Sequence, residues 1–409
     1  MSKIFLKIFL LAMCVALLGG CFEEERVITA DMRGGSINEK PVKVNGDRGK
    51  GEDKKSNETS DKQGDTRIRS NQKNDIEEQL QSMSLEEKIG QMMMVGFIST
   101  ELDQDLIYSL NAFHFGGIIF FDRNLTSASQ AKRLVSEIEK TANQKFPMLF
   151  SIDEEGGTIA RGRDFLEAAP SQEEIGLSGD PAVATYWAIH NAKILRSIGV
   201  NINFAPVADV GSRDTRSFGT NPTIVTEFVE AAAQGYESEN FLYTLKHFPG
   251  IGKSKIDPHQ EVSNVEDSKE ILDADDLPPF KYIIRHHDNS RFMVMIGHLK
   301  YDALDPVNSA SLSPVIITDL LRNELGFKGV VITDDLEMGA IKNNVDVATL
   351  GVRMIEAGGD IALVCHDYAS QQAVYNGILA AVKRGEIPEE RIDESVRRIL
   401  RLKAHLRTA

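Results

Sequence analysis

Eight short apolar runs, each ending at a polar or charged residue, constrain the fold of this chain most strongly. They are continuous rather than alternating, which is typical of strands buried on both faces of a parallel sheet. The runs lie at 91–97, 116–121, 148–153, 200–210, 243–248, 292–298, 329–335 and 360–365. Amphipathic helical patterns separate them, for example at 127–143 and 314–325. Eight strands in about 335 residues predict an α/β fold, a single (β/α)8 TIM-type barrel over residues 75–409.

A doubly wound open sheet is the competing fold. It binds nucleotides through a glycine-rich turn after the first strand, and no such fingerprint follows the run at 91–97. Gly156-Gly157 follows Glu154-Glu155, and two carboxylates beside the glycines would repel a phosphate. The barrel therefore remains the prediction.

The first 21 residues are typical of an export signal. Lys3 and Lys7 precede an apolar core at 8–18 that is too short to span a bilayer. The run ends in Leu-Gly-Gly-Cys at 18–21, which resembles the bacterial lipobox, whose cysteine is lipidated and becomes the new N-terminus. An ordinary signal peptide that contains a cysteine is the alternative. The resemblance predicts an extracytoplasmic lipoprotein anchored to a bacterial membrane through Cys21.

Residues 22–74 keep no hydrophobic period and consist largely of Gly, Ser, Asn and charged residues. Such a segment cannot offset its ordering entropy, so we expect it to be disordered. A flexible chain of about 50 residues reaches roughly 40 Å, which is enough for a tether that lifts the domain off a membrane. A spacer without a further role is the alternative. The folded domain, 75–409, begins with a helix start at 84–87.

The composition excludes some functions. A formal net charge of −15 argues against a nucleic acid partner, because phosphate binding needs clustered Lys and Arg. Beyond Cys14 and Cys21 of the signal, Cys365 stands alone, so we expect no intramolecular disulfide. The Cys and His spacings do not resemble a zinc site, and we expect neither a metal nor a cofactor.

Polar residues gather at the carboxyl ends of the predicted strands. In a barrel this is the face on which active sites are assembled. One such residue is usually a solvated strand end, but six that converge on one face indicate a site. These six residues are Asp153, Asp209, Lys246, His247, His298 and Asp334.

The most specific motif is KHFPGIG at 246–252, followed by DPH at 257–259. It resembles the KHFPGxG…DxH signature of the family 3 glycoside hydrolases that are β-N-acetylglucosaminidases, often called NagZ-type. The resemblance continues through IDEEGG (152–157), NFAPVADV (203–210), IGHLKYDALD (296–305) and TDDLEM (333–338), and covers essentially the whole folded part. It implies a (β/α)8 hydrolase that acts on a carbohydrate without a cofactor.

The resemblance makes Asp334 the catalytic nucleophile. Its carboxylate at a strand end would attack the anomeric carbon and form a covalent glycosyl-enzyme, with retention of configuration. Asp335 would point to the other side of the strand, and it suits a helix-capping role better.

The resemblance also makes His259 the acid/base, oriented by Asp257. Imidazole titrates near neutrality, so it can protonate the leaving oxygen and later deprotonate water. The aspartate would fix the tautomer and stabilise the imidazolium. Without the family, a lone D-x-H in a polar loop is more often a surface feature.

A further set resembles the residues that bind the sugar. A carboxylate would accept hydrogen bonds from ring hydroxyls, and cationic groups would donate to them. The set comprises Asp153, Arg161, Arg216, Lys246 and His247. Either arginine could instead be ion-paired in the scaffold, with Asp153 or Asp209 as its partner.

Three more residues are expected around the pocket. Asp209 suits a supporting position behind the ligands. His298 and Met338 would shape the pocket wall, and both could equally be satisfied core residues.

The chain departs from the family pattern in the acid/base loop. Relatives commonly have His in place of Ile251, Asp or Asn in place of Lys253, and Ser in place of Pro258. Proline fixes its φ angle and removes a backbone donor, so we expect the dyad to be presented differently. We expect these changes to affect the rate and the leaving-group preference more than the reaction.

The predicted function is a monomeric exo-β-N-acetylglucosaminidase that trims terminal GlcNAc from peptidoglycan fragments. A β-glucosidase or β-xylosidase is a second hypothesis, but those relatives carry the acid/base carboxylate on a later domain, for which residues up to 409 leave no room. Transfer to phosphate is a third, because a neutral histidine repels phosphate less than a carboxylate does. A non-catalytic glycan-binding lipoprotein is the alternative from another class.

Overall fold

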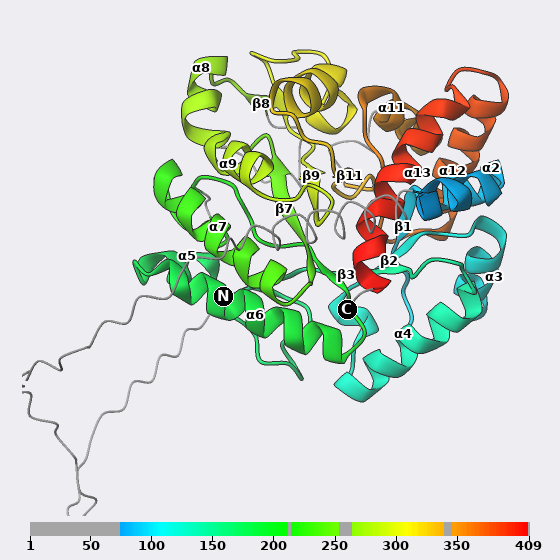
Figure 1. Ribbon diagram of the computed structural model, residues 1–409, viewed down its shortest axis with the longest axis horizontal. Coiled ribbons are helices and arrows are strands. Elements are labelled where there is room, and N and C mark those ends of the chain that lie inside the picture. The colour runs from blue at the N-terminus through cyan, green and yellow to red at the C-terminus, as the bar shows by residue number, and fades with distance from the viewer. Residues whose placement is uncertain (1–73, 212–213, 253–263, 339–345, 408–409) are drawn as a thin grey trace, which may run out of the picture. The chain divides into compact units, whose positions relative to one another are not determined.

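Eight parallel strands form one sheet whose order follows the chain, and this confirms the predicted barrel. The computed structural model describes residues 74–211, 214–252, 264–338 and 346–407. Each predicted apolar run supplies one strand (Figure 1). The strands are β1 (Met93–Val95), β2 (Gly117–Phe120), β3 (Leu149–Ile152), β6 (Ile202–Asn203), β7 (Leu242–Phe248), β9 (Phe292–Ile296), β11 (Val330–Thr333) and β12 (Ala362–Val364).

The sheet closes on itself between its first and last strands. β1 pairs with β2 on one side and with β12 on the other, in the register Met93↔Ala362 to Val95↔Val364. β12 meets β11 through a parallel bridge between Ile332 and Ile361. Because every barrel strand has a neighbour on both sides, no long edge is left to pair with another chain.

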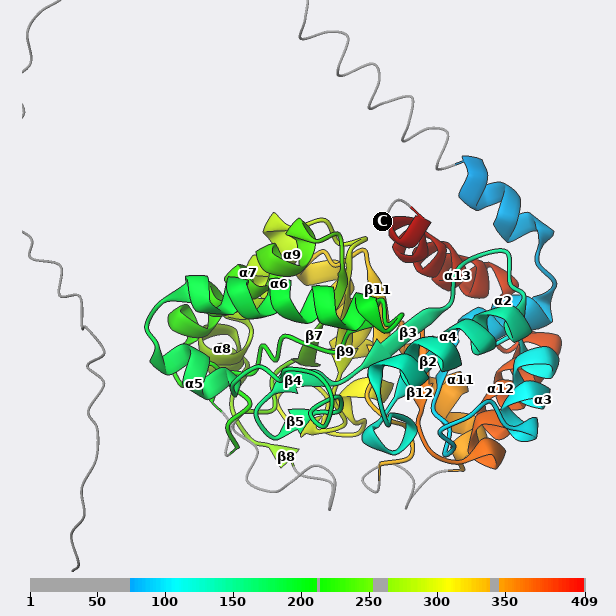
Figure 2. The ribbon, with the colours of Figure 1, turned by 90° about the horizontal axis from the view of Figure 1, so that it is seen from below.

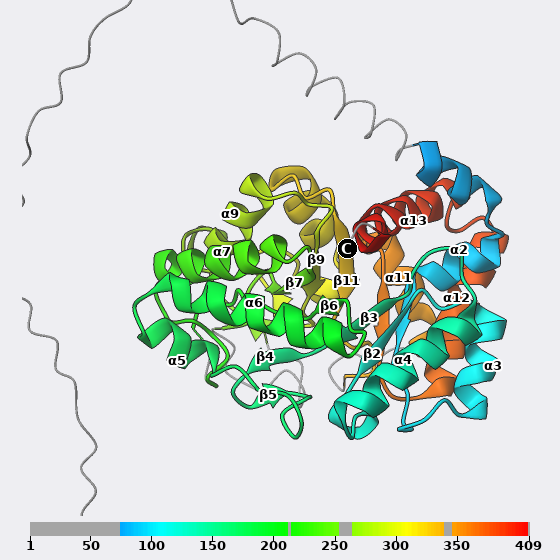
Figure 3. The same ribbon diagram turned by 60° about the horizontal axis from the view of Figure 1, so that its bottom comes forward.

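Helices surround the strands, as the alternating sequence pattern predicts. Figure 3 shows α6, α7 and α9 on one side of the barrel and α3, α4, α12 and α13 on the other. The helices are α2 (Leu85–Gln91), α3 (Gln104–Phe113), α4 (Ala128–Ala142), α5 (Gln172–Leu177), α6 (Pro181–Ser197), α7 (Pro222–Ser238), α8 (Lys269–Ile271), α9 (Pro278–His286), α11 (Val347–Ala357), α12 (Tyr368–Lys383) and α13 (Glu389–Ala404). Residues 74–82 are also helical.

Helix starts follow the capping residues in the sequence. The Ser84 hydroxyl accepts from the backbone N–H of Glu87 (3.1 Å), and the Glu87 carboxylate accepts from the Ser84 N–H (2.8 Å). This reciprocal capping box confirms the predicted start of α2. The predicted helix at 314–325 is present as η4 (Val315–Glu324), a π-helix.

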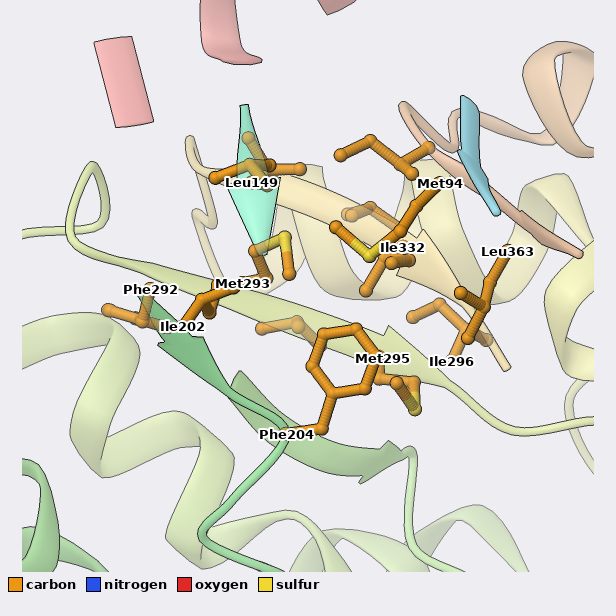
Figure 4. Packing of buried hydrophobic residues seen from close by; sticks show 14 of the residues in the cluster. Met94, Leu149, Ile202, Phe204, Phe292, Met293, Met295, Ile296, Ile332 and Leu363 are labelled. Atoms are coloured by element: carbon orange, nitrogen blue, oxygen red, sulfur yellow. The ribbon is translucent and has the colours of Figure 1, made fainter. Parts of the chain in front are cut away.

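The inside of the barrel is filled by apolar side chains from all around the sheet. Met94, Phe204, Met295 and Ile332 lie together there (Figure 4), and none of them is more than 3% exposed. Such packing supplies most of the free energy that holds the strand ends in place.

A buried charge cluster ties the strands to the outer helices at the opposite end from the carboxyl ends of the strands. Asp360, just before β12, is fully buried and accepts from Arg322 (2.6 Å), Arg398 (2.9 Å) and the hydroxyl of Ser395 (2.6 Å). It also accepts from the backbone N–H of Val331 (2.9 Å). The carboxylate therefore joins η4, β11 and α13.

Two small sheets extend the barrel. β4 (Glu154–Gly156) and β5 (Ile159–Ala160) form an antiparallel hairpin after β3, and β8 (Asn264–Val265) pairs with β10 (Lys300–Tyr301). Figure 2 shows both at the same end of the barrel. No helix in the described part of the chain is long and apolar enough to cross a membrane. Residues 1–21, with the predicted lipidation site Cys21, and the predicted tether at 22–74 lie outside the described residues, except for Asn74.

Candidate active site

A cavity of about 820 Å³ opens at the carboxyl ends of the barrel strands. The structure brings all six polar strand-end residues of the sequence prediction to its wall: Asp153, Asp209, Lys246, His247, His298 and Asp334. Arg161, Arg216 and Met338 also line it. The predicted acid/base pair, Asp257 and His259, lies outside the described residues, as do Lys253 and Pro258.

The β4–β5 hairpin gives two adjacent glutamates different surroundings. Neighbouring residues of a strand point to opposite faces, so Glu155 faces the cavity while Glu154 is buried on the other face. The turn needs glycine, because a Cβ at Gly156 would lie 2.2 Å from the carbonyl oxygen of Pro170 and Gly157 has a φ of +56°. These glycines therefore shape a hairpin, in agreement with the rejection of a phosphate loop.

Lys246 lies between two carboxylates on the cavity floor. Its Nζ is 2.5 Å from Oδ1 of Asp153 and 2.5 Å from Oε1 of Glu155. Burial alone would lower the pKa of Lys246, but the two carboxylates raise it more, so the ammonium stays charged. The Asp153 side chain is 16% exposed and the Lys246 side chain 2%. The aspartate is thus the more accessible of the two to a ligand.

The two arginines of the predicted sugar-binding set lie in different environments. Arg216 forms a bidentate pair with Glu155, with Nε and one terminal nitrogen at 2.8 and 2.9 Å. Its partner is therefore neither Asp153 nor Asp209, the partners considered from the sequence. Arg161 instead lies over the ring of Phe121, at 5.4 Å from its centroid.

Asp209 lies behind His247 and fixes its loop. Its Oδ2 is 2.8 Å from Nδ1 of the imidazole. Its Oδ1 accepts from the backbone N–H groups of His247 (3.1 Å) and Ile251 (2.9 Å). With Nδ1–H donating to Asp209, the other ring nitrogen faces Arg216 at 3.4 Å.

Asp334 and Asp335 diverge at the end of β11. Asp334 lines the cavity, and one carboxylate oxygen accepts from the backbone N–H of Asp335 (2.8 Å). Burial alone would raise the pKa of Asp334, but His247, this backbone donor and Lys246 together hold it below the usual value. Asp335 accepts from the N–H groups of Glu337 (3.1 Å) and Cys365 (3.2 Å). The structure thus places Asp334 as an ionised carboxylate at the cavity and Asp335 as an anchor of the neighbouring turn.

The cavity wall includes residues that are already satisfied by the scaffold. The two ring nitrogens of His298 bond to the Ser311 hydroxyl (2.8 Å) and the Asp335 carbonyl oxygen (2.9 Å), and burial lowers the pKa of this imidazole. A neutral ring that donates from Nε2 fits both partners. Ile251 adds an apolar side chain to this wall.

The buried carboxylate of Glu154 should make the stability of the fold depend on pH. One of its oxygens accepts from the Gly162 N–H (3.0 Å), while the other is buried without a hydrogen-bond partner among the described residues. Burial raises the pKa of Glu154 to about 7 from its ordinary value of 4.5. The folded state therefore keeps the Glu154 proton to a higher pH than the unfolded state does. The contribution of this group to the free energy of unfolding is fully present below pH 4.5 and is lost as the pH rises through about 7.

Glu154→Gln, which stays neutral, is expected to become more stable relative to the unmodified chain by about 2–3 kcal/mol between pH 5 and pH 8. Urea unfolding of both proteins at the two pH values measures the difference. A difference that does not change with pH would contradict the assignment.

The cavity is also lined by Glu155, Phe121 and His366, which carry no role in the sequence prediction. Glu155 bonds both Lys246 and Arg216. The Phe121 ring contacts both Arg161 and His366. Its centroid is 5.4 Å from the guanidinium carbon of Arg161 and 5.3 Å from the centroid of the His366 ring. Only Glu155 has a sequence signal: it is a carboxylate two residues after a strand-ending aspartate, in a chain that also sends cations to the same face.

The model for the glycosyl hydrolase family 3 N terminal domain matches residues 84–402. Beta-hexosaminidase A of Pseudoalteromonas piscicida is 33% identical over 338 residues, which are 75% of this chain and 56% of that protein. A beta-hexosaminidase of Stenotrophomonas maltophilia strain K279a is 33% identical over 294 residues, covering 69% of this chain and 86% of the relative.

Solved structures agree. A glycoside hydrolase family 3 beta-N-acetylglucosaminidase from Paenibacillus sp. strain FPU-7 superposes with a TM-score of 0.75 at 36% identity. The match covers 79% of this chain and 63% of that one, so the chain spans about three fifths of the length of this relative and of the Pseudoalteromonas protein. The barrel, its cavity and these matches together show that the chain belongs to glycosyl hydrolase family 3.

Proposed function

We propose that the chain is a retaining exo-β-N-acetylglucosaminidase that removes terminal β-linked GlcNAc, with peptidoglycan fragments as its substrate. The observation that carries the proposal is the meeting of Asp334 with the donors Lys246, His247 and Arg216 in one cavity at the end of a barrel. The names of the relatives, beta-hexosaminidase and beta-N-acetylglucosaminidase, support the choice of sugar.

The first chemical step uses Asp334 as the nucleophile. Its ionised carboxylate attacks the anomeric carbon, an ester bond forms, and the glycosidic C–O bond breaks. The leaving oxygen takes a proton from the imidazolium of His259, whose tautomer Asp257 fixes. Asp153 accepts from ring hydroxyls, and Lys246, Arg216 and Arg161 donate to them.

The second step returns the enzyme to its starting state. His259, now neutral, takes a proton from a water molecule whose oxygen attacks the anomeric carbon. The ester bond to Asp334 breaks and GlcNAc leaves with its original configuration. Two displacements at one carbon account for retention.

Turnover of a chromogenic β-N-acetylglucosaminide by the full chain, beside the matching β-glucoside, tests the proposal. We expect release from the GlcNAc compound alone, with the β-anomer as the first product by NMR. Added inorganic phosphate separates hydrolysis from phosphorolysis, because only phosphorolysis yields a sugar phosphate. A folded protein that binds GlcNAc without turnover would favour the glycan-binding alternative.

We further propose that Cys21 carries a lipid anchor and that residues 22–74 tether the catalytic domain to an extracytoplasmic membrane surface. The lipobox-like sequence at 18–21 supports this. Removal of residues 1–74 is expected to leave kcat/KM unchanged and to move the protein from the membrane fraction to the supernatant. Cys21→Ser, with the whole tether retained, is the matched variant. Membrane attachment that survives in Cys21→Ser would disprove the lipid anchor.

A further inference from the structure

The cavity floor contains a carboxylate, Glu155, to which the proposed mechanism gives no role. Glu155 follows Asp153 by two residues on the same face of the chain, and its side chain is only 2% exposed. Its Oε1 contacts Lys246 Nζ at 2.5 Å, and both of its oxygens receive the fork of Arg216 at 2.8 and 2.9 Å. A single carboxylate thus joins two cations that lie 30 residues apart in the sequence.

From this geometry we propose that Glu155 is a positioning residue for the sugar-binding cations. The inference rests on the proposed function, since it assigns how the same site holds its sugar. Glu155 acts through Lys246 and Arg216.

Hydrogen-bond capacity gives the first argument. A lysine ammonium has three N–H donors, and Asp153 and Glu155 take two of them, which leaves one for a hydroxyl of the ligand. Arg216 has five N–H donors, and Glu155 takes two on one edge of the guanidinium. Glu155 therefore determines which donors remain and in which direction they point.

Charge gives the second argument. The Lys246 side chain is 2% exposed and that of Arg216 is 18% exposed, and a buried cation is strongly unfavourable unless it is paired. Burial alone would raise the pKa of Glu155, but the two cations hold it well below its usual range, so the carboxylate stays ionised. With Asp153 it balances the two cations, and Asp153 keeps its exposed side for the sugar.

Removal of the negative charge of Glu155 should therefore weaken sugar binding. In Glu155→Gln the N–H groups of the new amide face the N–H donors of Lys246 and Arg216 and cannot accept from them. Lys246 then retains only Asp153 as a counter-ion. Displacement of binding groups by about 1 Å costs on the order of 100-fold in rate. We expect kcat/KM to fall about 100-fold, mostly through KM, and the affinity for free GlcNAc to fall by a similar factor.

The closing experiment measures KM, kcat and GlcNAc affinity for four proteins: the unmodified chain, Glu155→Gln, Glu155→Asp and Glu237→Gln. Two aryl glycosides with different leaving groups are used. Glu155→Asp keeps the charge, so its kcat/KM is expected to be at least about tenfold higher than that of Glu155→Gln. Glu237 pairs with Tyr243 and His287 away from the cavity, so Glu237→Gln should lower the melting temperature and leave kcat/KM within about twofold.

A loss shared equally by both aglycones, and mirrored in GlcNAc affinity, supports the proposal. A folded Glu155→Gln with unchanged KM and affinity overturns it, and so does a loss confined to kcat that depends on the leaving group. If Glu155→Gln does not fold, Glu155→Asp decides by the same two criteria. An unmodified chain that binds GlcNAc without turnover would overturn the proposed function, while the affinities would still decide the role of Glu155.

Discussion

Asp334→Asn is expected to lower kcat for a β-N-acetylglucosaminide by about 10⁴-fold or more, the scale seen when an enzyme loses its nucleophile. The amide has nearly the same shape as the carboxylate but cannot form the glycosyl ester. Its backbone donor from Asp335 remains available to the amide oxygen, so the fold should be retained. Steady-state kinetics beside a thermal melt measures both effects.

The neighbouring aspartate is the matched control. Asp335 accepts the backbone N–H groups of Glu337 and Cys365, so Asp335→Asn should lower the melting temperature while reducing kcat by less than about tenfold. A slowly turned-over substrate should leave a sugar-sized mass increase on the unmodified chain and none on Asp334→Asn. A larger loss of kcat in Asp335→Asn than in Asp334→Asn would show that the nucleophile has been assigned to the wrong aspartate.

Asp360→Asn is expected to lower the free energy of unfolding by about 3–5 kcal/mol, because it leaves buried cations without their counter-ion. Asp360 receives Arg322 and Arg398 at 2.6 and 2.9 Å, and Arg391 lies 3.9 Å away. The charges of these arginines outweigh burial and lower the pKa of Asp360, so the carboxylate is ionised in the fold. Chemical denaturation measures the loss.

An exposed ion pair provides the comparison for Asp360. Glu386 bonds Arg384 at 2.7 Å, but both side chains are about half exposed, and Glu386→Gln should change stability by less than about 0.5 kcal/mol. The activity per folded molecule should be unchanged in both variants, since neither residue lines the cavity. A loss below about 1 kcal/mol in Asp360→Asn would mean that the arginines find other partners.

The barrel was predictable because each strand is specified locally. A continuous apolar run is buried on both faces wherever it pairs, so the eight runs predict eight strands without knowledge of their neighbours. Most strands are shorter than the runs, whereas β7 (Leu242–Phe248) is one residue longer than its run at 243–248. In the run 200–210 the ladder covers only Ile202–Asn203, and Pro206, which has no N–H to donate, lies in the part beyond it.

The site was predictable only in part, because ion pairing depends on tertiary contacts. The strand-end rule brought Asp153, Lys246 and Asp334 to one face. It could not assign Arg216 to Glu155, since they lie 61 positions apart with the barrel strand β6 between them, and the choice among nearby carboxylates is made by geometry. The burial of Glu154 beside Glu155 likewise depends on the fold of the β4–β5 hairpin.

The closure of β1 against β12 has a consequence for biosynthesis. Met93–Val95 can pair with Ala362–Val364 only after the chain has been synthesised beyond residue 364. Contacts between distant segments form slowly, because the entropy of closing the intervening chain must be overcome first. The ring of strands that carries the cavity is therefore completed late in folding, when its first and last strands meet.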